Sequence, residues 1–180
     1  MDRTPQRRRG WARATAIVFA VVTGCSPAAA AGADGPYGVG ERLERVVLED
    51  QHGVERAVDA SSDVILFTRD MDAGDIVKAA LADTTAEQLD ARHVVYVSDI
   101  SAMPAMVARL LALPKMRKRP YPMLLDRDGD ATARFPARAG LVTVLRVDDL
   151  EIVAVEYIGD SAAVTAIVAG SAQSVKSASE

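Results

Sequence analysis

The chain has 180 residues, with 25 Asp and Glu against 21 Lys and Arg, so its formal charge at pH 7 is −4. Five arginines lie in the first 24 residues, and the 156 residues that follow carry a balance of −8. That acidic balance argues against nonspecific binding to nucleic acid or to anionic lipid headgroups. The length is enough for one ordinary domain with a sizeable core.

The beginning of the chain has the pattern of an export signal. A basic start precedes an apolar segment, residues 14–22, that is too short to cross a bilayer as a permanent helix. The run Val22-Thr23-Gly24-Cys25 then resembles the lipobox of bacterial lipoproteins, in which cleavage precedes a cysteine that carries a diacylglyceryl group. The resemblance implies a signal peptide over residues 1–24 and a lipid anchor, with fatty acids such as palmitate, on Cys25.

The residue after Cys25 is Ser26 rather than aspartate. In a lipoprotein this implies transfer to the periplasmic side of the outer membrane. The alternative is an ordinary secretory signal cleaved among the small residues 28–33, which would leave a soluble periplasmic protein. In both cases the expected order is a flexible tether over residues 25–39, a domain over residues 40–170 and a polar tail over residues 171–180.

Apolar runs separated by turn residues give the expected elements of the domain. Residues 46–48 and 54–58 are expected to form a hairpin around a Gly-containing turn. The further strands are expected at residues 64–67, 94–97, 121–125, 142–147 and 152–157. Helices are expected to begin at Asp72 or Gly74, at Thr84, at Ser101, and at Asp160 or Ser161. The helix after Ser101 is expected to gather its apolar residues on one face, namely Met103, Met106, Val107, Leu110 and Leu111.

The turn after the strand at residues 64–67 is the place where chemistry is expected. In α/β proteins, ligands and catalytic groups lie at the carboxyl ends of central strands. The turn offers three carboxylates, Asp70, Asp72 and Asp75. We interpret them as a candidate binding turn, faced by Tyr121 and Pro122.

The order of elements resembles the peroxiredoxin and redoxin branch of the thioredoxin-like superfamily. Residues 40–53 resemble the hairpin that precedes the first core strand of that branch, and residues 142–159 with the last helix are similar to the closing part of thioredoxins. The resemblance covers about residues 40–170 and implies an α/β three-layer sandwich with an N-terminal β-hairpin. A flavodoxin-like α/β sheet is the alternative, because it can use the same elements in the same order.

Family members place a catalytic cysteine, often as Cys-x-x-Cys, in the turn after the first core strand, where the helix dipole favours the thiolate. Cys25 is the sole cysteine of this sequence, and residues 68–75 contain none. The family's cis-proline corresponds either to Pro122 or, if the last hairpin is the matching one, to a position near Leu141 that lacks proline. We therefore expect a redox-inactive binding or assembly module without a cofactor, held at the membrane and meeting an envelope protein.

A phosphatase is one alternative. Asp70 and Asp72, with Ser98, Lys115 and the pair Asp148-Asp149, are similar to the residues of haloacid dehalogenase-type phosphatases, which use an aspartate nucleophile and magnesium. N-capping and solvated loop carboxylates explain the same residues without catalysis.

A periplasmic copper-binding protein is another alternative, because thioether sulfur suits Cu(I). Its candidate ligands are Met103, Met106, Met116, Met123, His52 and His93. Methionine at helical spacing is more often core filling. The run from Asp126 to Asp130 is interpreted as a strand-terminating turn rather than a calcium loop, and the basic run from Lys115 to Arg119 as a solvated connection.

Overall fold

The computed structural model describes residues 35–170. The strands are β1 (Val46–Glu49), β2 (Glu55–Val58), β3 (Val64–Thr68), β4 (Val94–Asp99), β5 (Leu124–Asp126), β6 (Val142–Asp148) and β7 (Glu151–Ile158). The helices are α1 (Met71–Ala80), α2 (Ala86–Asp90), α3 (Ala105–Val107), α4 (Leu113–Met116) and α5 (Ser161–Gly170), and a π-helical turn, η1 (Ala108–Ala112), joins α3 to α4. The predicted signal peptide, Cys25 and the polar tail lie outside the described residues. Between residues 35 and 170, no helix is long and apolar enough to cross a membrane.

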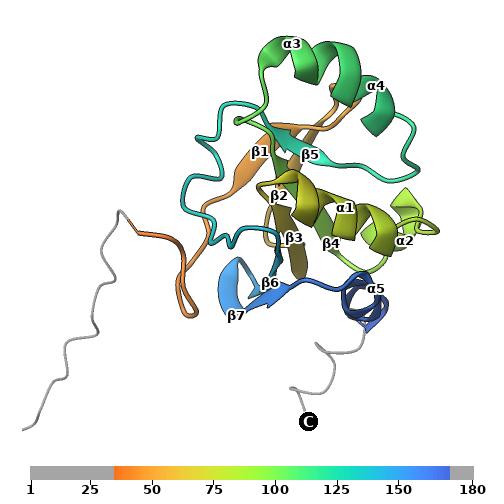
Figure 1. Ribbon diagram of the computed structural model, residues 1–180. Helices are drawn as coiled ribbons and strands as arrows, with labels where there is room; N and C mark the ends of the chain where they lie inside the picture. Colours follow the sequence, from red (N-terminus) through yellow and green to blue (C-terminus); the bar gives the residue numbers. More distant parts are fainter. Residues whose placement is uncertain (1–34, 171–180) are drawn as a thin grey trace, which may run out of the picture. The chain divides into compact units, whose positions relative to one another are not determined.

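Five strands form one sheet in the order β5-β4-β3-β6-β7 (Figure 1). Strands β3, β4 and β5 are parallel, whereas β6 runs antiparallel to β3 and β7 antiparallel to β6. Strand β6, which lies beside the central strand β3 and runs antiparallel to it, corrects the flavodoxin-like alternative, which requires a parallel strand there. The hairpin β1–β2 forms a separate two-stranded sheet, as its turn residues predict.

Strand β3 lies at the centre of the sheet, and all five of its residues are buried. This agrees with its uninterrupted apolar run, which is typical of a strand covered on both faces. Because side chains alternate along a strand, Val64 and Leu66 point to one face while Ile65 and Phe67 point to the other. Each pair belongs to a different hydrophobic cluster.

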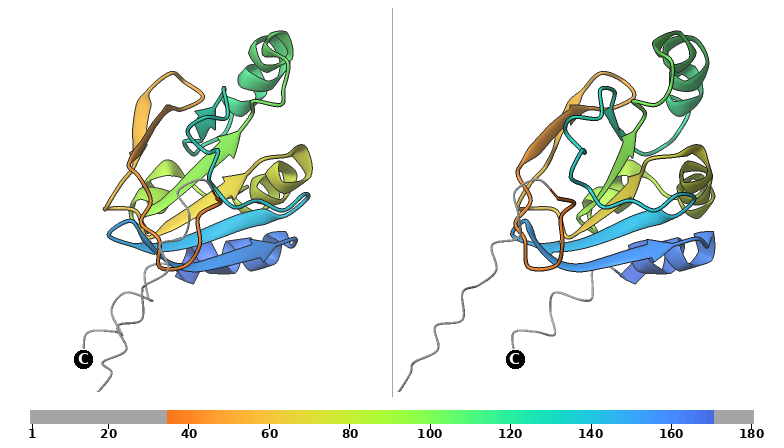
Figure 2. Two further views of the ribbon diagram at one scale, coloured as in Figure 1. Left: turned by 90° about the vertical axis from the view of Figure 1, so that its left-hand side faces the viewer. Right: turned by 60° about the vertical axis from the view of Figure 1, so that its left-hand side comes forward.

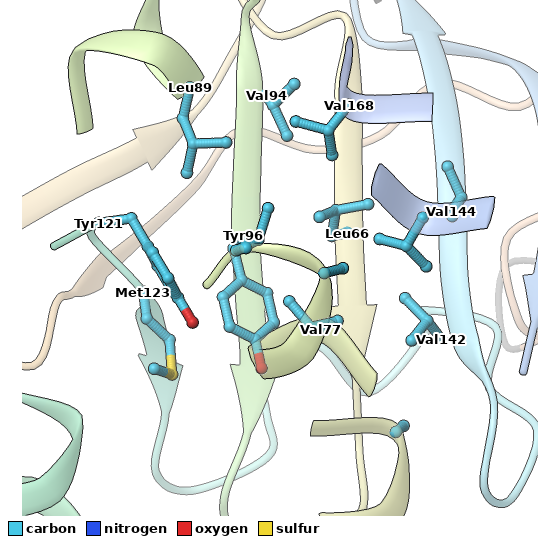
Figure 3. Packing of buried hydrophobic residues seen from close by; sticks show 14 of the residues in the cluster. Leu66, Val77, Leu89, Val94, Tyr96, Tyr121, Met123, Val142, Val144 and Val168 are labelled. Carbon is cyan, nitrogen blue, oxygen red and sulfur yellow. The ribbon is translucent and has the colours of Figure 1, made fainter. Parts of the chain in front are cut away.

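One face of the sheet is covered by helices. Val77 of α1, Leu89 of α2 and Val168 of α5 pack on Leu66 and its neighbours (Figure 3). The other face is covered by the hairpin β1–β2 and extended chain, which bury Phe135 against Phe67 with ring centroids 5.2 Å apart. The domain therefore has three layers, helices on one side of the sheet and a hairpin with loops on the other (Figure 2).

The N-terminal segment contacts both outer strands of the sheet. Arg42 forms an isolated β-bridge with Glu151 of β7, and Asp50 forms one with Leu124 of β5. Tyr37, which lies in the predicted tether, is buried, and Arg134 stacks over its ring at 4.0 Å. The described domain therefore includes residues before residue 40.

The strand predicted at residues 121–125 is shorter in the structure, where β5 covers only residues 124–126. The side chain of Gln51 forms the hydrogen bonds that a neighbouring strand would otherwise form with the backbone before β5. Its amide nitrogen donates to the Tyr121 carbonyl at 2.8 Å, and its amide oxygen accepts from the Met123 N–H at 2.9 Å. Gln51 thereby satisfies two buried backbone groups that lack a strand partner.

Two helix starts differ from the prediction. Helix α1 begins before Asp72 or Gly74, because Asp70 is its N-cap. The third helix begins four residues after Ser101, whose hydroxyl donates to Asp99 at 2.7 Å and does not cap a helix. Ser and Asp side chains commonly form such local bonds, which compete with capping.

Candidate functional site

The turn after β3 is closed by Asp70. One carboxylate oxygen, Oδ1, accepts the backbone N–H of Ala73 at 2.9 Å, which satisfies a free donor of the first turn of α1. The other, Oδ2, accepts the backbone N–H of Gly140 at 2.8 Å. Asp70 therefore fixes α1 to the loop that leads into β6, and both of its oxygens are engaged.

The preceding residue, Arg69, binds the neighbouring turns. Its Nε donates to the Asp99 carboxylate at 2.9 Å, and its Nη2 donates to the Thr132 carbonyl at 2.7 Å. The carboxylate of Asp126, which is 3% exposed, accepts the backbone N–H groups of Gly129 and Thr132. These bonds join the carboxyl ends of β3, β4 and β5. The buried carboxylates of Asp99 and Asp126 therefore close turns, and the run from Asp126 to Asp130 is one of these turns.

A buried hydroxyl cluster lies beneath the turn on the helical face. Thr68 Oγ1 lies 3.2 Å from the Tyr96 hydroxyl and donates to Ser98 Oγ at 3.2 Å. Burial raises the pKa of Tyr96 to about 12, although the hydrogen bond with Thr68 opposes the shift. Tyr96 and Tyr121 lie side by side, with ring centroids 6.4 Å apart and both hydroxyls directed to the carboxyl ends of β3 and β4 (Figure 3).

The structure brings together only part of the predicted site. Asp72 is exposed in the first turn of α1, whereas Asp75 lies one turn later beside Tyr121, lining the same groove. Pro122 instead lines a different cavity, of about 300 Å³, with Arg56 and His93. None of the described peptide bonds is cis. The strand that pairs with β3 beside the turn is β6, which Leu141 precedes, whereas Pro122 precedes β5.

The groove beside Tyr121 is lined largely by basic side chains. It has a volume of about 570 Å³ and lies between α1 and the chain that leads from α4 to β5. Four cationic side chains line it, together with Asp75, and they are Lys78, Lys115, Lys118 and Arg119. Ala79, Ala82, Pro120 and Tyr121 supply its apolar surface. Lys78 pairs with Asp75 at 3.3 Å, while burial raises the pKa of Tyr121 against the opposing influence of Arg119.

The helical segment next to the groove exposes its apolar residues. Met106 is 72% exposed, Leu110 65% and Leu111 60%. The sequence predicts that these residues share one helix face, and the structure leaves Met106, Leu110 and Leu111 exposed to solvent. Figure 2 shows the segment standing beside β5 and away from the sheet. Leu113 of this segment enters the core, and Ala108 and Met116 pack against it.

The structure separates the residues of the phosphatase hypothesis. Asp70 follows the carboxyl end of β3, whereas the antiparallel register pairs Val64 with Arg146 and so places Asp148 and Asp149 past the opposite end of that strand. Ser98 is bonded to Thr68 instead. The aspartate nucleophile and the acidic metal pair of that hypothesis therefore do not meet in this fold.

For the copper hypothesis, the candidate ligands differ widely in burial. Met106 is exposed and Met123 is buried next to Tyr121. His52 lies in the turn of the β1–β2 hairpin, and His93 lines the 300 Å³ cavity. Over residues 35–170, no group of three or more His, Cys, Asp or Glu side chains could hold a metal ion.

Solved structures with the same arrangement are thioredoxin-like. The chain is similar to peroxidoxin BcpB from Mycobacterium tuberculosis, with 17% identity, a TM-score of 0.53 and coverage of 77% of this chain and 98% of that one. It is also similar to a putative protein disulfide isomerase from Bacteroides thetaiotaomicron, with 16% identity, a TM-score of 0.52 and coverage of 73% and 86%. For a putative thiol:disulfide interchange protein DsbE from Chlorobium tepidum the identity is 11%, the TM-score 0.52 and the coverage 75% and 98%.

No family model matches the sequence, and no curated protein matches it. At these identities the similarity establishes the fold. The domain is thus an α/β domain of the thioredoxin-like fold, with the N-terminal hairpin that the sequence predicted.

Proposed function

We propose that this chain is a redox-inactive thioredoxin-fold module that binds a partner in the cell envelope. The observation that carries the proposal is Asp70. It follows the first core strand at the start of α1, where the resembled family places its thiol, and both of its oxygens are hydrogen-bonded to backbone N–H groups. A carboxylate at a helix N-terminus stabilises the helix but cannot exchange disulfides or attack a peroxide.

The sequence supports the same conclusion. Its one cysteine is Cys25, far from this turn in sequence and outside residues 35–170. Thiol chemistry requires a thiolate as nucleophile, so a domain without cysteine has no group for this reaction. The basic groove beside α1 is then the surface with the most pronounced chemical character, and we assign binding to it.

The proposed location is the periplasmic side of the outer membrane, with the lipid on Cys25 as the anchor. The support is the lipobox-like run that ends at Cys25 and follows a signal-like segment. Mass spectrometry of the protein from a membrane fraction tests this. We expect an N-terminal peptide that begins at an acylated Cys25, and a Cys25→Ser variant that is not acylated. An unmodified N-terminus beyond Cys25 would instead identify a soluble periplasmic protein.

Redox inactivity is tested on residues 26–180, a cysteine-free chain that keeps every contact described between residues 35 and 170. Hydroperoxide consumption with dithiothreitol and reduction of insulin disulfides are measured beside an active peroxiredoxin and an active thioredoxin. We expect both rates to equal those of buffer. Turnover above the buffer rate in either assay would contradict the proposal.

A further inference from the structure

The helical segment 105–116, which consists of α3, η1 and α4 and is called helix 105–116 below, exposes several large apolar side chains to solvent. In a soluble domain, exposed large apolar side chains are usually scattered, and a group of them marks an interaction surface. Here Met106, Leu110 and Leu111 are each at least 60% exposed on one short helical segment. Leu113 fixes the segment to the core, so the other three side chains are displayed on a supported element.

The same segment continues into the basic groove. Leu111 lies in the π-helical turn η1, Lys115 follows it in α4, and Lys118 lies just beyond the end of α4. Lys115 and Lys118 line the groove together with Lys78 of α1 and Arg119. The exposed apolar residues and the cations of the groove are therefore neighbours along one helical segment.

The cations of this surface are available to an external anion. Within residues 35–170, Lys115, Lys118 and Arg119 have no carboxylate at ion-pair distance, whereas Lys78 is paired with Asp75. The overall acidic balance argued against anionic lipids. Charges farther apart than about 8 Å are largely screened at physiological salt, however, so the local arrangement determines what binds at a contact surface.

We propose that helix 105–116 and the basic groove form a docking surface for an anionic phospholipid membrane. The phosphate headgroups bind Lys115, Lys118 and Arg119, while Met106, Leu110 and Leu111 enter the boundary between headgroups and acyl chains. A helix with apolar side chains beside a cationic face binds lipid interfaces by these two contributions together. This inference rests on the binding function proposed above and identifies the partner of the binding module as a membrane. The lipid anchor would hold the docking surface close to that membrane.

The test is cosedimentation of residues 26–180 with vesicles of phosphatidylcholine, with and without phosphatidylglycerol. We expect binding to the vesicles with phosphatidylglycerol, loss of that binding at high salt, and little binding to phosphatidylcholine vesicles. Lys115→Gln/Lys118→Gln should weaken binding roughly 30-fold, because each cation near the surface contributes about fivefold. Leu110→Ser/Leu111→Ser should weaken it about tenfold or more.

Two variants outside the proposed docking surface are matched controls. Arg42→Gln/Arg45→Gln removes the same charge as the lysine pair, and Val153→Ser removes an apolar side chain that is 51% exposed on β7. Both should bind vesicles like the parent chain. Circular dichroism must show the same melting temperature for each variant as for the parent, so that loss of binding is not loss of fold.

Several outcomes would overturn the proposal. They are absence of vesicle binding, equal weakening by the control variants, or binding of soluble glycerol phosphate in the groove without binding of vesicles. A dimer in sedimentation velocity that Leu110→Ser/Leu111→Ser dissociates, without vesicle binding, would assign the surface to a second copy of the chain. The redox assays contain no lipid, so a failure of lipid docking leaves redox inactivity standing.

Discussion

Asp70 and Gly140 are 70 residues apart in sequence, yet the carboxylate of the first accepts the backbone N–H of the second at 2.8 Å. The same carboxylate caps α1 through Ala73. One side chain thus joins the start of the first helix to the loop before β6, across the end of the central strand.

Replacement of Asp70 by Ala should therefore remove a helix cap and a tertiary bond together. We expect the free energy of unfolding to fall by about 1–3 kcal/mol. Asp72→Ala is the matched control, because Asp72 is exposed in the same turn, and it should change stability by less than about 0.5 kcal/mol. Urea denaturation followed by circular dichroism measures both, and equal effects would contradict the role assigned to Asp70.

Thr143 and Thr68 are buried threonines whose replacement by valine should change the free energy of unfolding in opposite directions. Thr143 Oγ1 is buried without a hydrogen-bond partner among the described residues, whereas Thr68 Oγ1 contacts the hydroxyls of Ser98 and Tyr96. Thr143→Val should raise the free energy of unfolding by about 1 kcal/mol, because it removes an unpaired buried hydroxyl at nearly constant shape. Thr68→Val should lower it by a similar amount. Denaturation midpoints that move in the same direction would refute this assignment.

Gln51 should be among the most sensitive polar residues of the domain. Its replacement by Ala leaves the Tyr121 carbonyl and the Met123 N–H buried without partners, at a cost of about 2–4 kcal/mol. His52→Ala, at the exposed neighbouring position, should be nearly neutral. Thermal melting compares the two variants. Hydrogen exchange of the Met123 amide should become faster in Gln51→Ala, and unchanged exchange would argue against the bond.

Tyr96 makes stability depend on pH in the alkaline range. Burial raises the folded-state pKa of Tyr96 to about 12, whereas the pKa of an unperturbed tyrosine is about 10. A raised pKa contributes stability that is complete below the unfolded-state pKa and is lost as pH rises to the folded-state pKa. We expect a loss of about 2–3 kcal/mol between pH 10 and 12. Tyr96→Phe should reduce this slope and remove the last step of the tyrosinate absorbance titration, and an unchanged titration would refute it.

The strands were predictable from sequence because their signal is local. Residues 64–67 form a continuous apolar run, and a run of this kind fits a strand buried on both faces. The turn after it is shorter than the predicted span of residues 68–75, because β3 extends to Thr68 and α1 begins at Met71. The site residues were harder to predict. Arg69 binds groups 30 and 63 residues away, and no spacing within the chain indicates such partners.

Helix 105–116 shows the limit of periodicity. Its apolar residues recur at helical spacing, which predicts a covered face, but burial depends on which element lies opposite. In this fold the segment stands beside β5, where nothing described covers Met106 or Leu110. The basic groove was missed for a related reason. Lys78 precedes Lys115 by 37 residues, and only the packing of α1 near the chain after α4 places both around one groove.

The contacts of the N-terminal segment with both outer strands have a further consequence. Border strands expose unpaired backbone groups that can recruit strands of other molecules and start aggregation. Arg42 occupies such groups on β7, and Asp50 occupies them on β5. The N-terminal segment therefore occupies part of each border, at the first residue of β7 and at the first residue of β5, and a proteolytic cut that released it would expose backbone groups at both borders at once.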